Sequence, residues 1–245
     1  MDWFVNLRPN SEARTRLFFF PYVGGGPTVF APWLAQLPNH IAGWAAHLPG
    51  RGSRHQEPAH KSLMPLVEEL SQAIEPLLDR PYAFFGHSFG ALVAFELARH
   101  LRRCGLPQPV TLFVSACKAP HLPDTHPPIH TLPDVELLEA LKGFNGISPE
   151  LLRQPEVMDL LITVLRADFE ALETYAYADE PRLNCCIVAF GGLHDPGVSR
   201  EHLEAWASQT DSIFRVEYYP GDHFFINSTR EAIIASINAE IKASS

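Results

Sequence analysis

The fold is decided by the stretch Tyr82-Ala83-Phe84-Phe85-Gly86-His87-Ser88-Phe89-Gly90. Its first four residues predict a short buried strand, and Ala91 to Cys104, rich in alanine and leucine, predicts a helix. A serine between two such glycines, at the turn from a strand into a helix, is the arrangement of a nucleophile elbow. Gly86 and Gly90 would let strand and helix pass closely. We therefore expect Ser88 to act as a catalytic nucleophile.

Short β-branched or aromatic runs alternate with amphipathic stretches along the chain, a pattern typical of βαβ units and a mainly parallel sheet flanked by helices. The length of 245 residues fits a single α/β domain over 1–245. The expected strands are Leu17 to Val23, Ile41 to Leu48, Tyr82 to Phe85, Val110 to Ala116, Cys185 to Phe190 and Ile213 to Tyr218. The expected helices are Thr28 to Leu37, a helix capped by Ser62 that runs to about Asp79, Ala91 to Cys104, Glu201 to Ser208 and Thr229 to Lys242.

The pattern changes at approximately residues 119–182, where a Pro- and His-rich segment precedes further helices. These are expected at Asp134 to Lys142, Pro149 to Arg153 and Pro155 to Tyr175. The insertion is too long for a plain connection between strands, and we interpret it as a helical lid over the strand ends. A decorated crossover helix is the alternative. Its apolar residues fall at helical spacing, which indicates packing more often than an acyl tunnel; they are Leu160, Leu161, Val164, Leu165 and Phe169.

A nucleophilic serine needs a base, and in folds with this elbow the partners follow in the order Ser, acid, His. His223 lies just after the last expected strand and is the favoured base, with His194 as its main rival. Asp195 follows the preceding strand on a glycine-rich turn, where it would orient the imidazole. Asp222 adjoins His223 but would have difficulty reaching its Nδ1. His87 is expected to face the neighbouring helix.

Two backbone N–H groups are expected to form the oxyanion hole. One is that of Phe89 at the start of the helix, and the other is that of Val23 or Gly24, with Val23 preferred. The run Gly24-Gly25-Gly26 could also suggest phosphate binding. It has neither a Gly-Lys-Ser/Thr continuation nor the G-x-G-x-x-G pattern with a downstream acid, so a nucleotide site is weakly supported.

Composition narrows the classes of partner. The formal net charge of −9 argues against nucleic-acid binding and gives no reason to expect an anionic membrane surface. No apolar run is long enough to span a membrane, and the N-terminus lacks the order of a signal peptide, so we expect a cytoplasmic protein. The four cysteines lack metal-ligand spacing and are expected to be buried or half-buried free thiols, with Cys185 and Cys186 on opposite faces of a strand.

Four blocks together resemble the type II, or editing, thioesterases of nonribosomal peptide and polyketide synthesis, which have the α/β-hydrolase fold. The blocks are Phe20-Pro21-Tyr22-Val23-Gly24-Gly25, Leu48-Pro49-Gly50-Arg51-Gly52-Ser53-Arg54, Gly86-His87-Ser88-Phe89-Gly90-Ala91 and Gly221-Asp222-His223-Phe224-Phe225. The resemblance covers nearly the whole chain, and the Pro-Gly-Arg-Gly block separates this group from generic esterases. The family usually has a small residue in place of Val23. Its lid often carries Arg-x-Asp and a tyrosine pair, here Arg166-Ala167-Asp168 and Tyr175-Ala176-Tyr177.

The resemblance implies an enzyme that removes wrong or stalled acyl groups from the phosphopantetheine arms of acyl or peptidyl carrier protein domains. An acyl-Ser88 intermediate would be hydrolysed by water activated at His223, without metal or organic cofactor. The sequence is compatible with a monomer but does not fix the oligomeric state. Carrier proteins are typically acidic, so docking would need a local basic patch, for which we expect Arg51, Arg54 and Lys118.

Three other functions remain open from the sequence. A medium-chain fatty-acyl thioesterase of lipid synthesis shares all these motifs. An acyltransferase would need a lid that excludes water. A non-catalytic binding module of the same fold is the least supported, because such modules often lose a member of the triad and none is missing here.

Overall fold

In residues 2–124, 127–142 and 155–243, which the computed structural model describes, seven strands form one sheet in the order β1-β3-β2-β4-β5-β6-β7. They are β1 (Phe4–Asn6), β2 (Thr15–Phe20), β3 (Ile41–Ala46), β4 (Tyr82–His87), β5 (Thr111–Ser115), β6 (Cys186–Gly192) and β7 (Phe214–Tyr219). β1 pairs with β3 antiparallel, and the other neighbours pair in parallel. The mainly parallel sheet expected from the alternating pattern is thus confirmed.

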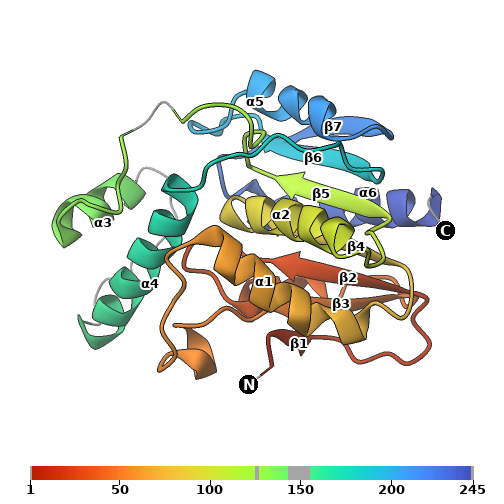
Figure 1. Cartoon of the computed structure of the whole chain (residues 1–245), viewed down its shortest axis with the longest axis horizontal. Helices are drawn as coiled ribbons and strands as arrows, with labels where there is room; N and C mark the ends of the chain where they lie inside the picture. Colours follow the sequence, from red (N-terminus) through yellow and green to blue (C-terminus); the bar gives the residue numbers. More distant parts are fainter. Residues whose placement is uncertain (1, 125–126, 143–154, 244–245) are drawn as a thin grey trace.

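Helices cover both faces of this sheet. The α-helices are α1 (Leu63–Ile74), α2 (Phe89–Arg103), α3 (Asp134–Lys142), α4 (Pro155–Glu173), α5 (Arg200–Glu204) and α6 (Arg230–Ala243). Short 3-10 segments are η1 (Pro27–Trp33), η2 (Gly52–Arg54), η3 (Glu75–Leu77), η5 (Ala205–Gln209) and η6 (Phe225–Asn227). In Figure 1, α1 and α2 lie in front of the sheet and α6 lies behind it.

Each face of the sheet packs its own hydrophobic core, because successive strand residues point to opposite sides. Phe84 belongs to the core under α1 and α2, and Phe85 to the core under η1 and α6. Cys185 and Cys186 divide between the same two cores, as the sequence predicted. All four cysteines are free thiols, but Cys104 is exposed rather than buried.

Three local predictions were wrong. β1 is too short, at three residues, to give a periodic signal, and it was not expected. The segment from Thr28 forms a 3-10 helix, because Pro32 has no N–H for an α-helical hydrogen bond. Ser62 stands at the N-terminus of α1 with extended backbone, but its side chain makes no capping hydrogen bond.

The insertion between β5 and β6 contains α3 and α4, which begin at the expected residues. Figure 1 shows both helices beyond the carboxyl ends of the strands, the edge at which parallel α/β sheets bind ligands. The apolar faces of α3 and α4 meet in a small cluster of Leu137, Leu141 and Leu165, with Leu161 and Phe169 packed against it. The apolar residues of α4 in this cluster therefore serve packing between the helices, as their spacing indicated. Leu160 is exposed, and the helix expected at Pro149 to Arg153 lies outside the described residues.

Candidate active site

Ser88 occupies a sharp turn between β4 and α2. Its φ of 55° and ψ of −119° lie in a region that non-glycine residues rarely adopt, and its N–H donates to the Ser115 carbonyl at 2.8 Å. A Cβ at Gly86 would lie 2.2 Å from the Gly90 carbonyl oxygen. A Cβ at Gly90 would lie 2.0 Å from the carbonyl oxygen of Phe20 on β2. The two glycines therefore permit the crossing of strand and helix that holds the serine in this strained turn.

His223 and Asp195 are in direct contact. His223 Nδ1 lies 2.8 Å from Asp195 Oδ2, and the side chains are 11% and 0% exposed. The other oxygen of Asp195 accepts the Gly197 N–H at 2.8 Å, which fixes the carboxylate. The loops after β6 and β7 meet closely here, since a Cβ at Gly192 would lie 2.3 Å from the carbonyl oxygen of Asp222. This close approach brings together two side chains from separate loops.

The rival residues are placed differently. His194 is exposed, and its backbone N–H donates to the Gly221 carbonyl. Asp222 Oδ1 accepts the Phe224 N–H at 2.9 Å within its own loop. The carboxylate that meets the His223 ring at Nδ1 is therefore the one from the β6 loop, although Asp222 is next to the histidine in sequence.

His87 was expected to face the neighbouring helix, and this is wrong. It ends β4 on the face of Phe85, away from α2, because strand residues alternate. The ring is fully buried, its Nδ1 lies 2.9 Å from Ser115 Oγ, and its centroid lies 5.4 Å from that of His223. Burial, together with the nearby His223, lowers the pKa of His87 well below its usual value. His87 is therefore a neutral neighbour of the candidate base.

The candidate oxyanion donors flank the serine. Phe89 is the first residue of α2, where backbone N–H groups have no partner within the helix. In the loop Pro21–Gly26, which we call the oxyanion loop, the Gly24 N–H donates to Asp168 Oδ2 and the Gly25 N–H to the Tyr22 carbonyl, each at 2.8 Å. The Val23 N–H makes no hydrogen bond to another described residue. The sequence offered the N–H of Val23 or of Gly24 as the second oxyanion donor, and the Gly24 N–H already donates a hydrogen bond within the protein.

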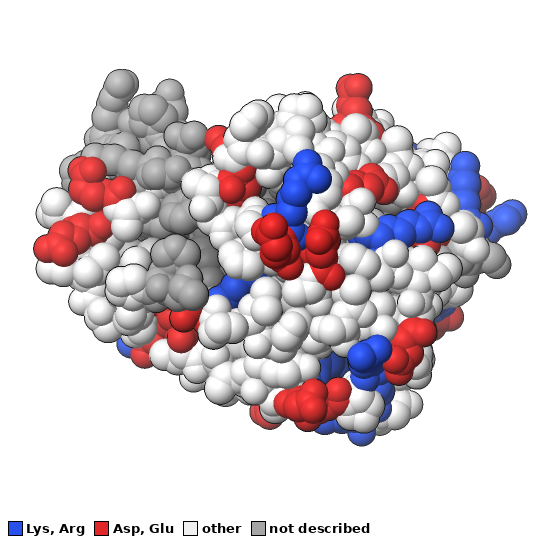
Figure 2. Space-filling model, turned by 90° about the horizontal axis from the view of Figure 1, so that it is seen from above, with Lys and Arg blue, Asp and Glu red and all other residues white. Residues whose placement is uncertain are grey.

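The expected basic docking patch is wrong. Arg51 and Arg54 are buried, because the turn after β3 directs them into the protein. Arg54 pairs with Glu57 and lies over the Trp3 ring at 4.1 Å, while Lys118 binds the Pro123 carbonyl at 3.0 Å. On the face shown in Figure 2, basic and acidic side chains lie next to one another rather than in a continuous basic patch.

Arg51 instead pairs with Asp168 of α4, at 2.7 Å between Nη2 and Oδ1. Sequence reasoning missed this pairing. Both residues lay in blocks singled out by the family resemblance, but a single sequence carries no signal that joins positions 117 residues apart.

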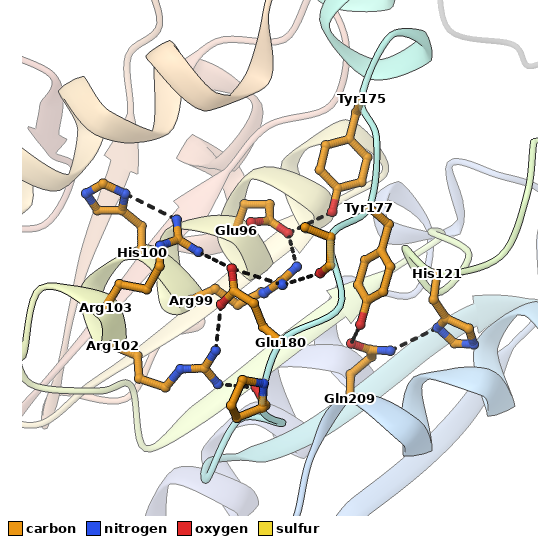
Figure 3. A network of polar contacts seen from close by, with 12 residues as sticks. Glu96, Arg99, His100, Arg102, Arg103, His121, Tyr175, Tyr177, Glu180 and Gln209 are labelled. Carbon is orange, nitrogen blue, oxygen red and sulfur yellow. Dashed lines mark hydrogen bonds and ion pairs between the residues drawn. The ribbon is translucent and has the colours of Figure 1, made fainter.

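A polar network holds the chain that leaves α4 against α2, the helix that begins at the elbow (Figure 3). The Tyr175 hydroxyl donates to Glu96 at 2.7 Å, and Glu96 pairs with Arg99 at 2.6 Å, both side chains being 3% exposed. Glu180 forms ion pairs with three arginines of α2: Arg99, Arg102 and Arg103. The second tyrosine of the pair, Tyr177, donates to Gln209 at 3.2 Å.

The described residues offer neither a metal site nor a membrane span. No group of three or more His, Cys, Asp or Glu side chains in them could hold a metal ion. No helix in them has the length and apolar character needed to cross a membrane.

The chain is similar to known proteins over nearly its whole length. The sequence model of the family described as "Thioesterase domain" matches residues 15–241. The chain is 41% identical to the linear gramicidin dehydrogenase LgrE of Brevibacillus parabrevis, over 98% of this chain and 93% of that protein. It is 42% identical to the gramicidin S biosynthesis protein GrsT of Aneurinibacillus migulanus, over 95% of this chain and 91% of that protein.

Among solved structures, the type II thioesterase BorB from the borrelidin biosynthetic cluster superimposes with a TM-score of 0.90. It is 32% identical, and the match covers 97% of each chain. The α/β-hydrolase fold expected for this chain is therefore confirmed. From its sequence and its fold together, the chain belongs to the thioesterase family.

Proposed function

We propose that this chain is an editing, or type II, thioesterase that hydrolyses acyl thioesters on the phosphopantetheine arms of carrier proteins. The contact of His223 Nδ1 with Asp195 Oδ2 at 2.8 Å, at the same sheet edge as the strained Ser88, carries the chemical part of the proposal. The substrate class is supported by the similarity to GrsT, named for gramicidin S biosynthesis, and to BorB, titled a type II thioesterase.

In the proposed reaction, Ser88 Oγ attacks the thioester carbonyl carbon while His223 Nε2 takes the hydroxyl proton. Asp195 holds the imidazole in the correct tautomer and stabilises its protonated form. The Val23 and Phe89 N–H groups bind the oxyanion of the tetrahedral intermediate. When this intermediate collapses, the C–S bond breaks and the thiol leaves with the proton from His223.

The acyl-Ser88 ester is then hydrolysed by the same groups. Water attacks the ester carbonyl and gives a proton to His223, and the second tetrahedral intermediate breaks its C–O bond to the serine. The proton returns to Ser88 Oγ, and the carboxylic acid leaves. These steps need no metal or organic cofactor, and the pantetheine belongs to the substrate.

We also propose that residues 119–182 act as a lid in this single-domain enzyme. The described helices of this segment lie beyond the carboxyl ends of the strands (Figure 1), the edge at which β4 leads into Ser88 and β7 into the loop of His223. The expected cytoplasmic location and the carrier-protein partner remain predictions.

The word dehydrogenase in the name of LgrE does not extend to this chain. A dinucleotide-binding loop places its third glycine five residues after the first, at the start of a helix. Here Val29 stands in that position, and the loop leads into the 3-10 segment η1 with Pro27 at its start. A hydride-transfer function therefore has no support in this loop.

The experiment uses a carrier protein loaded with a short acyl group, with intact mass as the readout. We expect wild type to remove the acyl group, Ser88→Ala to leave it in place, and the exposed Ser208→Ala to behave as wild type. If wild type cleaves a free acyl thioester but spares the loaded carrier, the serine chemistry stands and the editing role fails. A strong preference for medium-length acyl chains would instead favour the lipid-synthesis alternative, which the comparisons do not favour.

A further inference from the structure

We propose that Arg51 and Asp168 are positioning residues for the oxyanion loop, so that hydrolysis requires α4 to be seated on this loop. The inference rests on the proposed function, in which the Val23 N–H binds the oxyanion. It explains why the Pro-Gly-Arg-Gly block and the Arg-x-Asp of the lid, which have no role in the steps above, occur in one chain.

The two residues form a buried, two-pronged ion pair. Arg51 Nη2 lies 2.7 Å from Asp168 Oδ1, and Arg51 Nη1 lies 2.8 Å from Asp168 Oδ2. Their side chains are 8% and 3% exposed. Paired N–H···O bonds of this kind fix both the distance and the orientation of the two groups. Loss of one partner would also leave the other charge buried without compensation. The pair is therefore a strong and well-oriented connection between α4 and the turn after β3.

This pair also holds two peptide groups of the oxyanion loop, the one before Gly24 and the one after Gly25. Asp168 Oδ2 accepts the Gly24 N–H at 2.8 Å, and Arg51 Nη1 donates to the Gly25 carbonyl at 3.1 Å. Gly24 has a φ of +74°, so its conformation is one that few other residues would maintain. The hydrogen bonds with Asp168 and Arg51, two residues that do not belong to the loop, stabilise this conformation.

The held conformation determines where the Val23 N–H points. The Gly25 N–H donates to the Tyr22 carbonyl at 2.8 Å. In a trans peptide the carbonyl and the N–H point in opposite directions, so this bond orients the Val23 N–H away from the loop interior. A loop that lost its contacts with Asp168 and Arg51 could rotate these peptides and misdirect the oxyanion donor.

α4 contacts the loop through a second side chain, one turn before Asp168. A Cβ at Gly24 would lie 2.8 Å from Leu165 Cδ2, so the helix packs directly on the glycine. Val23 in turn packs against the cluster of Leu137, Leu141 and Leu165. Displacing α4 would therefore remove the acceptor of the Gly24 N–H and the apolar contact together. We expect the enzyme to be poorly active whenever the lid helix is away from the loop.

The test replaces Asp168 with asparagine, which keeps the size of the side chain but loses the ion pair. Removing one oxyanion donor typically lowers kcat by about 10²–10³-fold, and a misdirected donor should cost about 10–100-fold. We expect kcat to fall in this range for Asp168→Asn, while KM changes little. Arg51→Lys should give a smaller loss, because the ammonium retains the charge but not the two-pronged geometry.

Two inhibitors separate positioning from general damage. An acyl-pantetheine with a difluoromethylene ketone, C(=O)–CF2, in place of the thioester forms a tetrahedral adduct with the serine and uses the oxyanion hole, whereas a thioether analogue only occupies the pocket. We expect Asp168→Asn to weaken binding of the ketone in proportion to its loss of kcat/KM, and to leave binding of the thioether unchanged. Equal weakening of both, or of neither, would overturn the proposal.

A matched control variant and a double variant test whether a loss of kcat comes from misfolding. Glu173 also lies on α4 and accepts two backbone N–H groups, those of Ile129 and His130, but it does not touch the loop. Glu173→Gln should retain wild-type kcat. The double variant Arg51→Met with Asp168→Leu replaces the ion pair by apolar groups, which is often neutral for stability. It should fold with a wild-type melting temperature and still lose kcat; a folded double variant with wild-type kcat would contradict the positioning role.

Failure of the proposed function gives a different result. If wild type shows no acyl thioester hydrolysis that depends on Ser88, the proposed function itself is wrong. If wild type hydrolyses through Ser88 and Asp168→Asn is equally fast, the thioesterase proposal stands and the positioning role alone is rejected.

Discussion

Asp195 and Asp222 both lie near His223, and single substitutions distinguish their roles. Asp195→Asn would keep the shape of the side chain but let the imidazole take the wrong tautomer, so we expect kcat to fall by about 10³–10⁴-fold. Asp222→Asn keeps an oxygen for the Phe224 N–H, and we expect a change of less than about threefold. Steady-state hydrolysis of an acyl thioester measures both. An Asp222→Asn loss equal to that of Asp195→Asn would reject the assignment of the acid.

His87 gives a prediction on stability against pH. Because burial holds its pKa well below the usual value of about 6.5, the folded protein keeps it neutral while the unfolded chain takes up a proton below that pH. The contribution of this group is thus fully present above about pH 6.5 and is lost as the pH falls toward its folded pKa. The loss has a slope of at most about 1.4 kcal/mol per pH unit.

His87→Asn tests this directly, since asparagine can still bind Ser115 Oγ but cannot take up the proton. Urea unfolding between pH 7 and pH 5 gives the free energy of unfolding for each protein. As the pH falls, we expect the free energy of unfolding to decrease more steeply for wild type than for the variant, by up to about 1.4 kcal/mol per pH unit. Parallel curves would show that His87 does not remain neutral in the folded state.

At the scale of elements, the network in Figure 3 predicts unequal effects for its two glutamates. Glu96 is 3% exposed and neutralises the buried Arg99, so Glu96→Gln should lower the free energy of unfolding by about 3 kcal/mol. Glu180 is 23% exposed, and Glu180→Gln should cost less than about 1 kcal/mol. Equilibrium unfolding in urea compares them. Equal losses would mean that the buried pair does not anchor the segment after α4.

The elements divide clearly into those that the sequence could predict and those that it could not. The inner strands were recognisable because nearly all their residues are apolar. α2 was recognisable because it is rich in alanine and leucine and is followed by Gly105 and Pro107. β1 was not, since three residues give no period. The same limit applies to the site: Ser88, Asp195 and His223 each follow a recognisable strand, whereas the Arg51–Asp168 pair depends on how α4 packs, which no local pattern encodes.

At the scale of the whole molecule, the candidate site depends on sheet topology. Ser88 follows β4, Asp195 follows β6 and His223 follows β7, and the order β4-β5-β6-β7 brings their loops to one edge of the parallel sheet. Residues 135 positions apart in the chain, such as Ser88 and His223, thereby come to the same edge. The scaffold determines where the loops lie, and α4 and the oxyanion loop add the finer positioning.

The net charge gives the last prediction. With a formal charge of −9 and with Arg51 and Arg54 buried in internal ion pairs, the enzyme should repel an acidic carrier protein. The Debye length shortens from about 30 Å at 0.01 M salt to about 10 Å at 0.1 M, so added salt screens that repulsion. We expect kcat/KM for an acyl-carrier protein to rise severalfold between 10 and 100 mM NaCl, and kcat/KM for an uncharged acyl-pantetheine thioester to stay constant. A fall with salt for the carrier alone would instead show that a local basic surface outweighs the charge of the whole molecule.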